Sequence, residues 1–115
     1  MKKIYFLKTC DTCKRILNQI PLDGFELQEI KTQPITVKQL EELHAFTGSY
    51  EVLFSRRSKK YAAMDLKNQS LTEKDYKQLI LDEYTFLKRP VIVSEDRIFI
   101  GNSKNNVAAL VAYLN

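Results

Sequence analysis

The sequence predicts an α/β fold, a mixed four-stranded sheet covered by helices and interrupted by a helical insertion. Apolar residues follow the order strand, helix, strand at the start of the chain and strand, strand, helix at its end, with helical periodicity between. The chain has 115 residues, of which 44% are hydrophobic, and only three glycines and three prolines. This length and composition suit one domain over residues 1–115, with no linker or disordered tail.

The first element is the short apolar run from Lys3 to Leu7, which suits a buried strand. The next segment predicts a helix that Pro21 ends. Its apolar face recurs at i, i+3, i+4 and i+7, at Cys13, Ile16, Leu17 and Ile20. After the turn at Asp23-Gly24, a second strand alternates at Phe25, Leu27 and Glu29. Strand, helix, strand over about thirty residues is a βαβ unit, so these two strands should be parallel.

Residues 33–87 carry helical periodicity, and we expect them to form an insertion into a core of residues 1–32 and 88–115. Thr36 and Gln39 fit a capping box for a helix that stops near Gly48. Brief helices are predicted at Tyr50–Phe54 and Tyr61–Met64, and Thr72 opens a longer one.

The final section predicts two strands and a helix. Val91–Val93 and Ile98–Ile100 are strands that a three-residue loop, Ser94-Glu95-Asp96, connects. Strands this close must be antiparallel. Ser103 is an N-cap candidate for the last helix. The apolar positions of that helix are Val107, Leu110, Val111 and Leu114.

Both cysteines of the chain lie in one loop, Thr9-Cys10-Asp11-Thr12-Cys13, directly after the first strand. Two thiols at this spacing indicate redox chemistry or metal binding. Cys10 falls at the helix start, where unpaired N–H groups favour a thiolate, whereas Cys13 falls on the buried face. Cys10 is therefore the predicted nucleophile and Cys13 the resolving thiol.

Two other interpretations of the two cysteines remain. Cys13 suits the role of an ordinary small core residue. A structural zinc site needs four ligands, and besides the two cysteines the chain offers only His44. We therefore expect no metal site, and we expect His44 to be a surface or half-buried residue.

The composition favours a cytoplasmic protein without a membrane anchor. The apolar run after Lys2 and Lys3 is shorter than a signal-peptide core, and no stretch approaches the ~20 apolar residues of a membrane span. A structural disulfide is not expected in the reducing cytoplasm. The net charge of +4 permits an anionic partner, but no recognition-helix motif indicates direct nucleic-acid binding.

Two arginine-containing segments are candidates for anion binding. The run Arg56-Arg57-Ser58-Lys59-Lys60 is either a solvated face or an anion clamp, because guanidinium groups bind oxyanions bidentately. Arg89 precedes Pro90 at a strand opening, and a proline there often fixes a tight turn, sometimes cis. Arg89 would stabilise the Cys10 thiolate if this turn faces the cysteine loop.

The chain resembles the ArsC/Spx family, which includes glutaredoxin-coupled arsenate reductases, Spx-type transcriptional regulators and YffB-like proteins. The resemblance covers nearly the whole chain. It is carried by Thr9 to Lys14, by Arg57-Ser58-Lys59, by Leu87 to Val93 and by Ile100-Gly101. It implies a thioredoxin-like core with the helical insertion between its second and third strands.

The resemblance also implies roles for individual residues. Cys10 matches the family's nucleophile, and Arg89 matches its anion-binding arginine beside a cis proline. The substrate- or anion-binding set that it implies is Thr9, Thr12, Lys14, Arg57 (or its neighbour Arg56), Arg89 and Pro90. Where the arsenate reductases place a third arginine, this chain has Gly101-Asn102-Ser103.

Two functions therefore follow as hypotheses. The first is a thiol oxidoreductase without a bound cofactor, which acts on a small thiol, disulfide or anionic substrate and is reduced by glutathione, thioredoxin or glutaredoxin. The second is an Spx-like redox-sensing regulator that binds the RNA polymerase alpha subunit. The second rests on the CxxC spacing, which resembles that of the regulators, and on Gly48-Ser49-Tyr50-Glu51, which looks like their docking loop.

Overall fold

The computed structural model describes residues 1–115, which form two compact units. One unit comprises residues 1–33 and 89–115, and the other comprises residues 34–88. The first unit contains all four strands and two α-helices, whereas the second contains α-helices, 3₁₀ turns and one isolated β-bridge between Phe54 and Leu87. No helix in either unit is both long and apolar enough to cross a membrane.

The sheet has the strand order β2-β1-β3-β4, from β1 (Lys2–Phe6), β2 (Glu26–Glu29), β3 (Val91–Ser94) and β4 (Arg97–Ile100). Strand β1 is parallel to β2 and antiparallel to β3, and β3 is antiparallel to β4. The predicted α/β class, with a mixed four-stranded sheet, is therefore confirmed.

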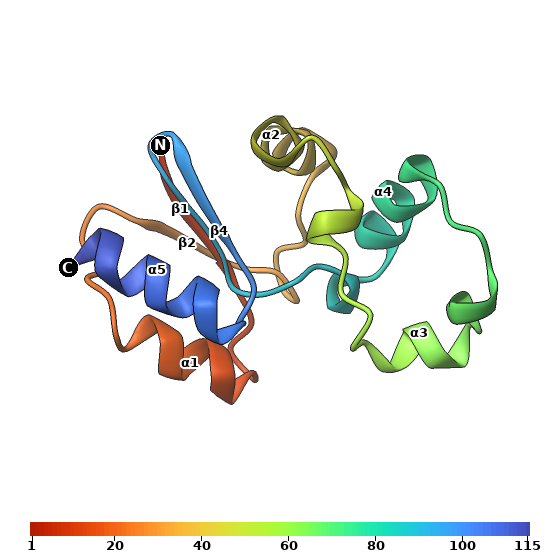
Figure 1. The fold of residues 1–115 in the computed structure, drawn as a ribbon, viewed down its shortest axis with the longest axis horizontal. Helices are drawn as coiled ribbons and strands as arrows, with labels where there is room; N and C mark the ends of the chain where they lie inside the picture. The colour runs from red at the N-terminus through yellow and green to blue at the C-terminus, as the bar shows by residue number, and fades with distance from the viewer. The chain divides into compact units, whose positions relative to one another are not determined.

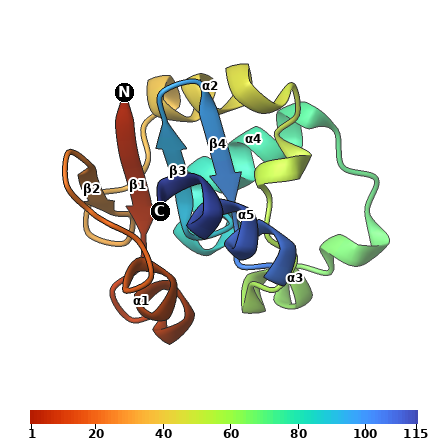
Figure 2. The same cartoon turned by 60° about the vertical axis from the view of Figure 1, so that its left-hand side comes forward.

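Helices α1 (Asp11–Leu17) and α5 (Lys104–Leu114) cover one face of this sheet (Figure 1). Turning the molecule brings both helices to the front, with α5 over β3 and β4 (Figure 2). The strand register places Ile4 opposite Ile92, and Ile92 opposite Phe99, on the face that the helices cover. The buried cluster between the layers is Ile4, Ile16, Leu17, Ile20, Ile92, Phe99 and Leu110. Burial of these apolar side chains is the main stabilising contribution to this unit.

Two local predictions in this unit were wrong. Helix α1 ends at Leu17, with Asn18 as its C-cap, although Ile20 is still buried in the core. Apolar periodicity marks what is buried, and it does not tell where helical hydrogen bonding stops. The β3–β4 loop has two residues instead of three, because Ser94 pairs with Arg97. The tight turn places Glu95 at φ 55°, a conformation that glutamate seldom adopts.

The unit of residues 34–88 contains α2 (Val37–Thr47), α3 (Lys59–Ala63) and α4 (Glu73–Asp82). Three 3₁₀ turns connect them: η1 (Glu51–Leu53), η2 (Leu66–Asn68) and η3 (Tyr84–Phe86). The predicted capping box of Thr36 and Gln39 is present, and Gly48 ends α2 at φ 69°. The segment predicted as a brief helix at Tyr50–Phe54 is only the η1 turn, and α3 starts two residues before Tyr61. Phe54 stacks on Phe86 in the interior, with ring centroids 5.0 Å apart.

Candidate active site

The sheet topology brings three separate segments to one edge of the first unit. Strand β1 runs into the cysteine loop, and its antiparallel partner β3 starts opposite that end, because Tyr5 pairs with Val91. Arg89 and Pro90, joined by a cis peptide bond, immediately precede β3. The N–H of Gly101, just after β4, donates to the Pro90 carbonyl at 2.8 Å. Residues of β1, β3 and β4 that are far apart in sequence therefore meet beside the thiols.

Cys10 is the N-cap residue of α1. Its extended backbone (φ −93°, ψ 108°) turns the chain into the helix, and its Sγ accepts a hydrogen bond from the Cys13 N–H at 3.4 Å. The Cys10 N–H donates to the Leu7 carbonyl at 3.1 Å, which closes the turn after β1. The side chain is half-buried, so the sulfur is held in place while part of it stays accessible.

The surroundings of Cys10 favour its thiolate. Burial by itself raises the pKa of the Cys10 thiol, whereas hydrogen bonds from the Cys13 N–H and the Cys13 thiol lower it. The positive charge of Arg89 and the N–H of Thr12 lower the pKa further. The net result is a pKa below the ordinary value of a cysteine, which increases the fraction of thiolate at a given pH.

Cys13 has the opposite character. Its side chain is fully buried in the helix–sheet interface, and both cysteines are present as thiols. Burial raises the pKa of Cys13 to about 12, and the nearby Cys10 adds to this through a hydrogen bond and its charge. The Leu7 N–H and Arg89 act in the other direction but do not balance the burial. The two thiols of this loop therefore differ in pKa, which is lowered for Cys10 and raised for Cys13.

Glu29 also lies at this edge. The sequence pattern identified it only as an alternating position of the second strand. It lies at the end of β2 and is 9% exposed. One of its carboxylate oxygens accepts the Lys8 N–H at 3.2 Å, and the other accepts the Thr32 N–H and hydroxyl. Glu29 thereby connects β2 to the segment that carries Cys10. The parallel pairing of β1 and β2, which brings their carboxyl ends together, is the signal that could have revealed it.

The remaining predicted residues differ in their surroundings. Thr9 and Lys14 are exposed, and Thr12 is half-buried. Arg57 belongs to the unit of residues 34–88, where its side chain is exposed before α3. Its neighbour Arg56 is engaged within that unit, because it donates to Glu51 at 2.7 Å and to the Tyr76 hydroxyl at 3.1 Å. Of the two arginines that the sequence left open, Arg56 is therefore the one held by an ion pair.

The zinc hypothesis requires several ligand side chains close together. No group of three or more His, Cys, Asp or Glu side chains in residues 1–115 lies close enough to hold a metal ion. His44 is half-buried and stacks on Tyr50, with ring centroids 4.2 Å apart.

Replacing Arg89 with glutamine should raise the pKa of Cys10, because it removes the cationic neighbour that favours the thiolate. The pH dependence of the alkylation rate of Cys10 by iodoacetamide measures this pKa. Arg97→Gln is the matched control. It also removes an arginine, but an exposed one at the start of β4, beside the turn that connects β3 to β4. An identical pH profile for wild type and Arg89→Gln would contradict the assignment.

Fold and site together define a thioredoxin-like α/β protein with a CxxC pair at the start of its first helix. More particularly, the chain belongs to the ArsC family, whose model matches residues 5–110.

Several individual proteins are similar to this chain in sequence or in structure. The chain is 25% identical over 113 residues to the "Global transcriptional regulator Spx 1" of Bacillus cereus. The alignment covers 93% of this chain and 84% of the relative. Among solved structures, a YFFB protein superposes with a TM-score of 0.81 at 22% identity over the full length of both chains. A putative arsenate reductase from Yersinia pestis gives 0.77 at 21% identity, over 95% of this chain and 99% of the other. These two structural likenesses establish the fold.

Proposed function

We propose that this protein is a cytoplasmic thiol–disulfide oxidoreductase in which Cys10 is the nucleophile and Cys13 the resolving thiol. The observation that carries the proposal is the inequality of the two thiols, whose pKa values are moved in opposite directions within one loop. Arg89, whose charge favours the Cys10 thiolate, would also hold an anionic substrate beside it, with Thr9, Thr12, Lys14 and Pro90 as further candidates. Arg57, in the other unit, is a separate candidate for anion binding.

The proposed first step is the attack of the Cys10 thiolate on a disulfide R–S–S–R′. A bond forms between Cys10 Sγ and one substrate sulfur, and the substrate S–S bond breaks to release R′S⁻. In the second step Cys13 loses its proton and attacks Cys10 Sγ, which releases RS⁻ and leaves a Cys10–Cys13 disulfide. The substrate has then gained two electrons. A dithiol such as thioredoxin, or two glutathione molecules, would restore both thiols. An oxyanion held by Arg89 is the other substrate class we propose.

The second step should be the slower one. Cys13 is fully buried, and burial is the largest cause of its raised pKa, so very little of it is thiolate at neutral pH. Once Cys10 is in a mixed disulfide its negative charge is gone, and one contribution to the raised pKa of Cys13 disappears. Burial remains. The mixed disulfide on Cys10 should therefore persist long enough to be detected.

Mass spectrometry of the Cys13→Ser variant tests the assignment of the two roles. With hydroxyethyl disulfide as substrate, this variant should accumulate one mercaptoethanol adduct on Cys10, because no second thiol can displace it. Wild-type protein should end as the Cys10–Cys13 disulfide, and Cys10→Ser should form neither product. An adduct on Cys13 in the Cys10→Ser variant, formed at the wild-type rate, would refute the proposed order.

A second proposal is a redox-sensing regulator that docks on the RNA polymerase alpha subunit. It is favoured by the relatives named as Spx regulators and by the way the Gly48–Glu51 loop is held. Glu73 accepts the N–H groups of Tyr50 at 2.7 Å and Glu51 at 3.2 Å, which fixes the loop from within its own unit. Binding of the purified alpha subunit, measured by calorimetry with reduced and with oxidised protein, tests this proposal. No binding in either state would remove it.

A further inference from the structure

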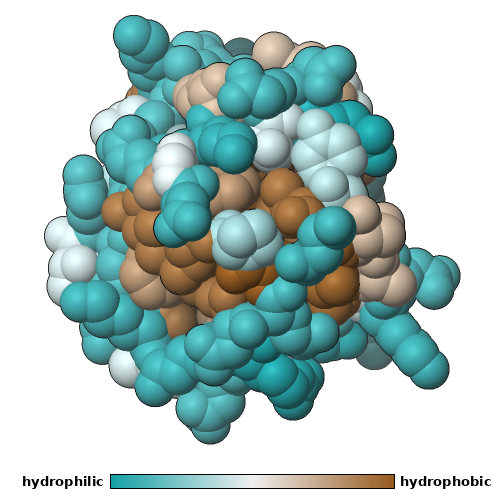
Figure 3. All heavy atoms as spheres, turned by 90° about the vertical axis from the view of Figure 1, so that its left-hand side faces the viewer, coloured by the Kyte–Doolittle hydropathy of each residue, from teal (hydrophilic) through white to brown (hydrophobic).

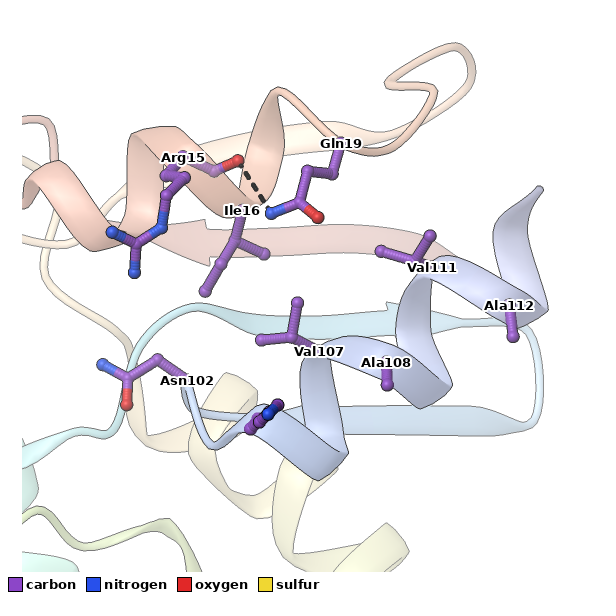
Figure 4. A pocket seen from close by; sticks show the side chains of 9 residues that line it. Arg15, Ile16, Gln19, Asn102, Val107, Ala108, Val111 and Ala112 are labelled. Atoms are coloured by element: carbon purple, nitrogen blue, oxygen red, sulfur yellow. Dashed lines mark hydrogen bonds between the residues drawn. The ribbon is translucent and has the colours of Figure 1, made fainter.

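A groove between α1 and α5 lies on the outer surface of the unit that carries the cysteines (Figure 4). Its volume is ≈ 650 Å³, within the range of ligand-binding sites in proteins. The mechanism proposed above uses none of its lining residues. They are Arg15, Ile16, Gln19, Asn102, Lys104, Val107, Ala108, Val111 and Ala112.

The walls of the groove are apolar. Ile16 from α1 faces Val107 and Val111 from α5, and the small side chains of Ala108 and Ala112 leave space between the helices (Figure 4). Both alanines are exposed. The space-filling view shows a continuous hydrophobic area with a hydrophilic rim on the side of the molecule where α1 and α5 lie (Figure 3). Contiguous apolar surface of this kind marks an interaction site in a protein of this size.

The charges of the groove are of one sign and lie at one end. Arg15 and Lys104 contribute the only charged side chains of the lining, and no carboxylate is among them. The two helices run in the same direction, and Arg15 lies with Asn102 at the end of the groove where α5 begins (Figure 4). Lys104 is the first residue of α5. Cys10 caps α1 at that end, roughly 7 Å from Arg15 along the helix axis.

We propose that this groove is a docking site for an acidic, apolar segment of a partner polypeptide whose disulfide Cys10 attacks. Apolar side chains of the segment would lie between Val107, Val111 and Ile16, and its carboxylates would meet Arg15 and Lys104. The lining runs along α5 from Lys104 to Ala112, a length of about 12 Å, which favours a polypeptide segment over a small molecule as the occupant. The inference rests on the proposed function and deepens it, because it names a protein disulfide as the substrate class. The bonds that form and break are those of the two steps given above.

The test compares two activated disulfides under single-turnover conditions. One is a synthetic peptide of leucines and glutamates with a cysteine at one end, linked to thionitrobenzoate. The other is N-acetylcysteine amide with the same leaving group. Attack by Cys10 releases yellow thionitrobenzoate from both, and the ratio of the two rate constants reports docking alone. We expect the peptide to react at least about tenfold faster with wild-type protein. A ratio near one would overturn the proposal.

Two adjacent alanines of α5 provide a matched pair of variants. Ala108→Trp fills the groove and should bring the ratio close to one while the small disulfide reacts as before. Ala109→Trp places the same side chain on an exposed position outside the groove and should leave the ratio unchanged. Arg15→Glu should lower the ratio for the acidic peptide by about fivefold, whereas Arg97→Glu should not. Equal effects of the two tryptophans, or of the two glutamates, would overturn the proposal.

Equilibrium binding separates failure of the docking site from failure of the proposed chemistry. A fluorescent peptide with serine in place of its cysteine should bind wild type and Cys10→Ser equally, as measured by anisotropy. If it binds but neither activated disulfide is attacked, the oxidoreductase proposal fails and the docking surface stands. If the peptide does not bind, or if sedimentation shows that a second copy of the chain occupies the groove instead, the docking proposal is overturned.

Discussion

Replacing Cys10 with serine should lower the rate of disulfide reduction by at least about a thousandfold, because a serine hydroxyl at this position stays protonated and cannot attack sulfur. The helix should be unaffected. Cys10 is the N-cap of α1, and serine is among the preferred N-cap residues. The measurement is the glutathione-coupled reduction of hydroxyethyl disulfide, with the uncatalysed rate subtracted.

Cys13→Ser is the control that separates nucleophile from resolving thiol. It should keep the burst of thiol released in the first step while its steady-state rate falls. Serine at this fully buried position leaves a hydroxyl in an apolar site, so a loss of about 1–3 kcal/mol in the free energy of unfolding is expected. Urea unfolding of both variants shows whether they are folded under assay conditions. Equal steady-state rates for wild type and Cys10→Ser would refute the proposed mechanism.

Much of the sheet could be predicted because its strands are short apolar runs with breakers beside them. Ile4 and Ile92 lie in the two central strands. The sequence predicted the parallel pair β1–β2 and the antiparallel pair β3–β4, whereas the pairing of β1 with β3 is a finding of the structure. The helix boundaries were less predictable. Ile20 continues the apolar pattern of α1 and is buried in the same core, but hydrogen bonding of the helix stops at Asn18.

The thiol pair could be recognised from the sequence because both cysteines lie within one helical turn. Their neighbours are contributed by distant strands. That the Arg89 charge acts on Cys10 depends on the antiparallel pairing of β1 with β3, across about eighty residues of sequence. Glu29 and the α1–α5 groove were missed for the same reason. Arg15 and Lys104 are two of many cations in the sequence, and only the packing of the two helices on one face of the sheet places them in the lining of one groove.

The stability of the protein should fall at alkaline pH because of Cys13. In the unfolded chain this thiol loses its proton near pH 9, whereas in the folded protein its pKa is raised to about 12. Between these values the unfolded state binds fewer protons than the folded state, so stability decreases as pH rises. The contribution is fully present below pH 9 and is lost towards pH 12, with a slope of up to about 1.4 kcal/mol per pH unit. Urea unfolding under reducing conditions between about pH 8 and about pH 11 measures it.

Comparison with Cys13→Ala isolates this thiol from the lysines and tyrosines that titrate in the same range. The difference in unfolding free energy between wild type and Cys13→Ala should become less favourable to wild type as pH rises, by roughly 3 kcal/mol over two units. Cys10→Ala should show the opposite sign. The pKa of Cys10 is lowered in the folded state, so wild type gains stability over this variant as pH rises towards the ordinary pKa of cysteine. A pH-independent difference for Cys13→Ala would mean that its thiol is not held protonated, and the proposed slow resolution step would lose its physical basis.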